Sequence, residues 1–172
     1  MRRGRSVVVL WLAAWSVASP ALAADGDVYQ AWVAHDSDFC ALGKKTRTQT
    51  KTWSHSRSKK NENHLLATLA STRDLIKQVI GDVDAQTPSS QDGTRAKTLV
   101  QRSNRNFDAS IHELARAVRA ATSHPGSSGS KAHAHAAGRD SDKATKDEHS
   151  ARKAFTKAGV AIKKNPDACA SQ

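Results

Sequence analysis

The chain has 172 residues, with 27 Lys and Arg against 16 Asp and Glu, and its net charge of +11 favours anionic over basic partners. It contains no G-x-S-x-G, H-E-x-x-H or C-x-x-C-H sequence and no phosphate-binding glycine loop. This excludes the common signatures of serine hydrolases, zinc proteases, covalent haem proteins and nucleotide-binding enzymes. We therefore expect one domain that binds a partner, is not an enzyme and needs no cofactor.

Residues 1–23 have the order of a secretory signal peptide. Three arginines lie among the first five residues, an apolar run covers 7–18, and Pro20 precedes an Ala-Leu-Ala sequence that ends at Ala23. The apolar run is shorter than the ~20 residues that a membrane-spanning helix needs. We expect cleavage after Ala23, no transmembrane anchor in the mature chain, and a periplasmic or secreted location. An uncleaved membrane anchor is the alternative.

Cleavage would leave residues 24–172 as a single domain. The leader holds three of the 27 basic residues and no acidic one, so 24 basic and 16 acidic residues remain and the net charge is +8. In an exported protein, this charge points to anionic partners outside the cytoplasm, and intracellular nucleic acid is not an expected partner.

Residues 24–60 carry two conflicting patterns. Apolar side chains spaced for one helix face come first, and threonines at alternate positions from 46 to 52 follow, as in a strand. No second segment offers a partner strand, and a lone strand would leave its backbone groups unpaired. We expect this region to be helical, either in one piece or broken near Gly43.

Three aromatic residues, Tyr29, Trp32 and Phe39, lie in the first part of that region. Core packing is the simpler interpretation, because the mature chain has few other large apolar residues. If residues 25–38 instead extend beyond the bundle, the three rings would form an exposed patch and a partner site.

Three later segments have the period of an amphipathic helix. Asn61 or Asn63 is the expected N-cap of the first, and Ser89 with Asp92 has capping-box spacing before the second. Their apolar stripes are Leu65, Leu69, Thr72, Ile76, Val79 and Val83; Leu99, Ser103, Phe107, Ile111, Leu114, Val118 and Ala121; and Ala144, Ala151, Phe155, Ala158 and Ile162.

Residues 123–139 are rich in Ser, Gly, Ala and His and lack an apolar period, which predicts a flexible loop. The last helix is then expected to begin near Asp140 and to end before Pro166. Four helices with mostly short connections predict an all-α fold, an antiparallel up-down helical bundle.

Cys40 and Cys169 are the only cysteines, and in an exported protein such a pair predicts a disulfide. The bridge would close a loop of about 130 residues and stabilise the fold by about 4–5 kcal/mol on chain-entropy grounds. In an up-down bundle it also requires the first helix to continue past Cys40 to about Lys59. Free or metal-bound thiols are the alternative.

Between Asp38 and Glu62 the chain has no acidic residue but many basic ones. Clustered cations with an aromatic ring can bind phosphates and sugars. We expect this run to engage an anionic cell-envelope component or an acidic protein, and a solvated helix face is the alternative. The predicted anion-binding residues are Lys44, Lys45, Arg47, Lys51, Trp53, Arg57, Lys59 and Lys60.

His133 and His135 give a second functional hypothesis, a periplasmic protein that binds copper, nickel or zinc. A stable site needs three or four ligands, and these two histidines supply only part of that set. A third hypothesis is a secreted effector or an immunity-type inhibitor of one, a class of interaction module that leaves little signature in sequence.

Overall fold

The computed structural model describes residues 20–162, and every regular element in that part of the chain is an α-helix. The predicted all-helical class is confirmed for these residues. Most of the expected signal peptide and Cys169 lie outside them. The helices are α1 (Pro20–Val33), α2 (Asp36–His55), α3 (Lys59–Asp84), α4 (Gln91–Ser123) and α5 (Ser128–Lys157).

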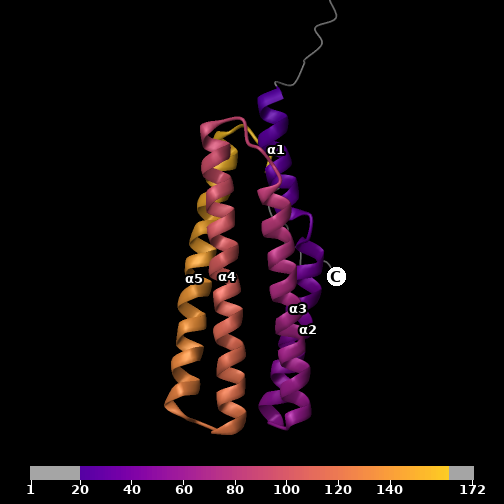
Figure 1. Ribbon diagram of the computed structural model, residues 1–172, viewed down its shortest axis with the longest axis vertical. Coiled ribbons are helices and arrows are strands. Elements are labelled where there is room, and N and C mark those ends of the chain that lie inside the picture. Colours follow the sequence, from indigo (N-terminus) through magenta and orange to yellow (C-terminus); the bar gives the residue numbers. More distant parts are fainter. Residues whose placement is uncertain (1–19, 163–172) are drawn as a thin grey trace, which may run out of the picture.

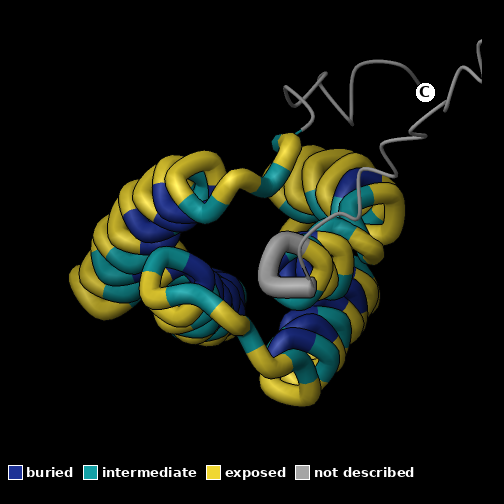
Figure 2. Tube along the Cα trace, turned by 90° about the horizontal axis from the view of Figure 1, so that it is seen from above, coloured by how far each residue is buried: buried dark blue, intermediate teal, exposed yellow. Residues whose placement is uncertain are grey.

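The helices form an elongated bundle (Figure 1). α1 and α2 follow one another along one edge and make a single column beside the long helices α3, α4 and α5. α2 joins α3 at one end of the bundle, α3 joins α4 at the other, and α4 joins α5 at the first end again. Seen from above, the buried residues lie on the sides of the columns that face other helices (Figure 2).

The break between α1 and α2 falls at Ala34 and His35, and Gly43 lies inside α2. The Nε2 atom of His35 lies 2.9 Å from Oδ2 of Asp82, which ties the junction to α3. α2 continues through the threonine-rich stretch and ends at His55, so the helical interpretation of that stretch is confirmed.

Three serines begin the long helices. Ser58, Ser90 and Ser127 each accept a hydrogen bond from the backbone N–H three residues later, which satisfies a donor that the helix cannot pair itself. The N-cap of α3 is therefore Ser58 instead of Asn61 or Asn63. The cap of α4 is Ser90, one residue after the predicted position.

Residues 128–139 are helical, so the expected loop at 123–139 is shortened to the few residues before Ser128. They lack large apolar side chains because this part of α5 packs against α4 through alanine and serine. At the other end, α5 stops at Lys157, earlier than predicted. Gly159 has a φ of +81°, a left-handed conformation that favours glycine and ends a helix.

The interface between α4 and α5 is made of small side chains at seven-residue spacing. Three serine hydroxyls donate hydrogen bonds across it to carbonyl oxygens: Ser103 to Ala144 at 2.8 Å, Ser110 to Ala137 at 2.8 Å, and Ser130 to Ala117 at 3.3 Å. Residue numbers rise along α4 as they fall along α5, so these two helices run in opposite directions. Side chains this small let the two backbones approach closely.

The apolar core has two clusters. The cluster at the α1 end contains Tyr29, Trp32 and Phe155, whose rings lie 5.4 Å (Tyr29–Phe155) and 5.9 Å (Trp32–Phe155) apart between centroids. Core packing of Tyr29 and Trp32 is therefore confirmed. The second cluster is centred on α3 and α4, and the partly buried Phe39 packs against both clusters.

Asp25 ties α1 to the start of α4. Its side chain is buried, and Oδ1 accepts hydrogen bonds from the backbone N–H groups of Ser89 at 2.9 Å and Ser90 at 3.3 Å. A carboxylate beside the first turn of a helix is also favoured by the helix dipole. The first residues after the expected cleavage site are thus part of the folded domain.

Candidate functional site

The cations of α2 lie on the side of the helix that faces away from the core. Lys44, Arg47 and Lys51 are exposed and are spaced by three and four residues, so they share one side of the helix. The less exposed positions Phe39, Leu42, Thr46, Gln49 and Trp53 follow the same spacing on the other side. Together with the exposed Lys45, Arg57 and Lys60, these three cations form what we call the α2 basic surface.

Three of the predicted anion-binding residues, Lys59, Trp53 and Arg57, contact other side chains of the protein. The Nζ atom of Lys59 lies 2.8 Å from Oε2 of the buried Glu62, so its charge is paired. Trp53 is partly buried and donates its Nε1–H to Oγ1 of Thr122 at 3.1 Å. The guanidinium of Arg57 covers the Trp53 ring, with Cζ 5.6 Å from the ring centroid. Trp53 therefore anchors α2 to α4, and Arg57 occupies a face of its ring.

The two histidines proposed for metal binding do not converge. His133 Nδ1 lies 2.6 Å from Oε2 of Glu113 in α4, and this contact lowers the pKa of the Glu113 carboxyl. His135 is exposed and, two residues further along α5, points in a different direction. Within residues 20–162, no group of three or more His, Cys, Asp and Glu side chains is placed to hold a metal ion.

Cys40 is buried in α2, beside the apolar core. Its expected partner, Cys169, is outside the described residues, so the Cys40–Cys169 disulfide stays a prediction. α2 continues well beyond Cys40, as the predicted bridge requires.

A cleft that no sequence motif indicates lies between the α1–α2 column and the α4–α5 pair. Its volume is about 240 Å³. Its walls come from three stretches of the chain that are distant in sequence, 32–39, 103–107 and 141–152, which is why no local motif reveals it. The lining residues are Trp32, Asp36, Phe39, Ser103, Asn104, Phe107, Ser141, Ala144, Thr145, Glu148 and Arg152.

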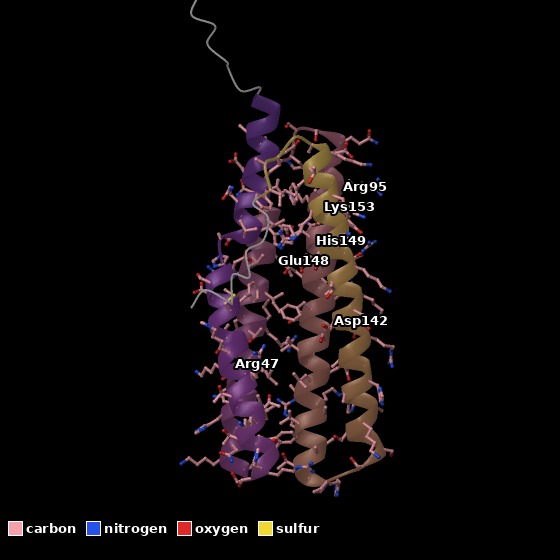
Figure 3. All side chains as sticks on the ribbon, turned by 180° about the vertical axis from the view of Figure 1, so that it is seen from behind. Arg47, Arg95, Asp142, Glu148, His149 and Lys153 are labelled. Carbon is pink, nitrogen blue, oxygen red and sulfur yellow. The ribbon has the colours of Figure 1, made fainter. Side chains whose placement is uncertain are left out.

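The charged groups of this cleft form an ordered arrangement. Arg152 lies with Cζ 5.0 Å from the centroid of the Trp32 ring and with a guanidinium nitrogen 3.1 Å from Oε1 of Glu148. Figure 3 shows Glu148 on the side of α5 that faces the α1–α2 column. Burial raises the pKa of Asp36, with Arg152 opposing and Glu148 adding to that rise. The cleft thus combines aromatic walls with two carboxylates and one cation.

A smaller cleft, of about 160 Å³, lies between the start of α4 and the end of α5. Arg95, Lys153 and Lys157 line it, and the Asp92 carboxylate partly offsets their charge. Figure 3 shows Arg95 and Lys153 close together on the outer side of this helix pair.

Comparisons of the chain with protein families, with curated proteins and with solved structures found no match. Within residues 20–162, every helix is either too short or too polar to span a lipid bilayer.

Proposed function

We propose that the protein is exported, is cleaved after Ala23, and acts as a non-enzymatic binding protein that engages an anionic polymer of the cell envelope through the α2 basic surface. In this proposal residues 24–172 form one antiparallel up-down bundle, closed by the Cys40–Cys169 disulfide. The protein works in the periplasm or after secretion.

One observation carries the proposal. Lys45, Arg47 and Lys51 are exposed on a rigid helix and form no ion pair within the described residues, and no acidic residue occurs between Asp38 and Glu62. Exposed cations of α5 such as Arg139 also form no ion pair within the described residues, but they share their helix with acidic residues such as Asp140 and Asp142. Cations without internal partners keep their full attraction for phosphates and carboxylates of a ligand.

The length of α2 fits a repeating ligand. Twenty helical residues extend over about 30 Å. Regularly spaced cations along such a helix match the repeated charges of lipopolysaccharide or of an anionic cell-wall polymer better than a single small anion. An acidic protein is the alternative partner, and the test separates the two.

The test compares two triple variants with the same change in charge. One replaces Lys45, Arg47 and Lys51 by Gln on α2. The other replaces Lys131, Arg139 and Lys146, which are exposed cations of α5, by Gln. Each cation near an anionic lipid surface contributes about 1 kcal/mol, so we expect the α2 variant to bind lipopolysaccharide vesicles about 100-fold more weakly. We expect the α5 variant to lose at most about threefold.

Equal losses in the two variants would mean that only net charge matters and would contradict the proposal. Stronger retention on immobilised polyglutamate than on lipopolysaccharide would favour the acidic protein partner. Intact mass of the exported protein under non-reducing conditions checks the leader and the disulfide together. The expected mass begins at Ala24 and is lower by two hydrogens than that of the reduced chain.

A further inference from the structure

We propose that the cleft between the α1–α2 column and the α4–α5 pair binds a small organic cation, a protonated amine attached to a flat apolar body. This site is separate from the α2 basic surface, and the inference does not depend on the envelope-binding function.

The charge balance of the cleft favours a cationic ligand. The guanidinium of Arg152 pairs with Glu148 and stacks on Trp32, and it forms no ion pair with Asp36 within the described residues. Asp36, in contrast, has no hydrogen bond or ion pair within the described residues, although it is partly buried. The cleft therefore holds two carboxylates against one guanidinium and is locally acidic, in a protein that is otherwise strongly basic.

Burial affects Asp36 more strongly than the nearby charge of Arg152 does. Desolvation is the largest cause of its raised pKa, because burial removes water from the charged form and the attraction of Arg152 offsets only part of that loss. An ammonium group beside Asp36 would supply the missing donor and charge. Hydrogen bonds to charged groups are stronger than those between neutral groups.

The polar lining also fits a ligand that donates hydrogen bonds. An ammonium group has three donors and no acceptor. The Ser103 hydroxyl donates a hydrogen bond to the Ala144 carbonyl oxygen. The Asn104 side-chain NH₂ donates one to the Val100 carbonyl oxygen. The oxygen atoms of both side chains therefore remain as acceptors.

The aromatic walls of the cleft indicate the shape of the apolar part of the ligand. The rings of Phe39 and Phe107 lie 6.1 Å apart with an angle of 52° between their planes, and Trp32 adds a third ring to the lining. Such walls favour a flat apolar body. The volume of about 240 Å³ lies below the range of ~300–1,000 Å³ that is usual for drug-sized ligands, so a smaller molecule is expected.

The test is titration of the mature protein with phenethylammonium, followed by Trp fluorescence and by two-dimensional NMR. 2-Phenylethanol is the neutral analogue and phenylacetate the anionic one. We expect saturable one-to-one binding of phenethylammonium, with NMR shifts centred on Trp32 and Phe107, and no saturable binding of the other two. The triple Gln variant of the α2 basic surface should bind phenethylammonium like the wild type, which separates this inference from the proposed function.

Asp36→Asn is the decisive variant, and Asp38→Asn is its matched control. Asp38 lies in the same turn of α2 but has 64% of its side chain exposed. We expect Asp36→Asn to weaken phenethylammonium binding by about tenfold or more, and Asp38→Asn by less than about twofold. Glu148→Gln, which also removes a cleft carboxylate, gives an independent check if Asp36→Asn does not fold.

Three results would overturn the inference. The first is no saturable phenethylammonium binding to the folded wild type. The second is equal binding of 2-phenylethanol, which would indicate a purely apolar site. The third is unchanged affinity in both the Asp36→Asn and the Glu148→Gln variants.

Discussion

Gly93 lets the Asp25 carboxylate lie against the first turn of α4. A Cβ atom at position 93 would overlap the Asp25 side chain, whose Oδ1 accepts hydrogen bonds from two backbone N–H groups before the helix. The requirement for glycine here is steric, because the residue sits in a helix and has no left-handed conformation. This contact joins the first helix to the fourth.

Gly93→Ala should therefore destabilise the protein by about 1–3 kcal/mol, because the added methyl group displaces a buried carboxylate from its donors. Urea unfolding of the mature protein measures the loss. Gly81→Ala is the control, since nothing lies near a Cβ at that position in α3. It should stabilise by about 0.4–1 kcal/mol. Equal effects of the two substitutions would show that the Asp25 contact does not matter.

Ala144→Leu should separate α4 from α5. Ala144 is buried where its carbonyl oxygen accepts the Ser103 hydroxyl proton, and a larger side chain would push the two backbones apart. We expect a cost of about 1–3 kcal/mol by thermal unfolding. Ala132→Leu, on an exposed position of the same helix, should change stability by less than about 0.5 kcal/mol.

Asp108 should make stability depend on pH in the acid range. Arg73 of α3 donates two hydrogen bonds to it, at 2.7 and 2.9 Å, and these lower the pKa of the Asp108 carboxyl. The stabilisation is complete above the unfolded pKa of about 3.9 and is lost as the pH falls through the lower folded value. Asp108→Asn should cost about 0.5–1 kcal/mol at neutral pH, a figure reduced for the partial exposure of the pair.

That cost should shrink as the pH falls below about 3.9, because the wild type then loses the same interaction. Unfolding titrations of both proteins at several pH values measure the difference. Asp74→Asn, which removes a highly exposed carboxylate, should show almost no pH-dependent difference. A cost for Asp108→Asn that stays constant into the acid range would contradict the assignment.

Phe155→Ala should release α1 from the rest of the bundle. Phe155 is fully buried and contacts the rings of Tyr29 and Trp32. Large-to-small changes of this kind cost about 3–5 kcal/mol. Hydrogen exchange should show faster exchange in residues 24–33 of the variant than in the part of α3 near Leu65. Uniform acceleration along the whole chain would argue that α1 has no separate role.

Much of the fold could be predicted from apolar periodicity. The stripes through Leu65 and Ile111 predicted α3 and α4 because those helices bury large side chains. The first half of α5 was missed because it buries alanines, and alanine carries little apolar signal. The seven-residue spacing of Ser103, Ser110 and Ala117 was the available sign, since small residues at regular spacing allow close helix packing.

Of the candidate sites, the local one could be predicted from the sequence and the one built from distant helices could not. A charge run such as 44–51 is local, so the sequence predicted which residues it contains, and helical geometry then placed them on an outer face. The amine cleft depends on how α2, α4 and α5 are spaced, and no segment of sequence records that spacing. The partnership of Trp53 with Thr122 was hidden for the same reason.

The contact between Tyr29 and Phe155 also affects the order in which the molecule can be built. Tyr29 lies in α1 and Phe155 in α5, so this end of the core cannot close until α5 has been synthesised. Contacts so distant in sequence are among the slowest to form. For a chain that we propose to be exported, late closure would leave α1, the first helix after the leader, without its aromatic partner while the helices between are synthesised.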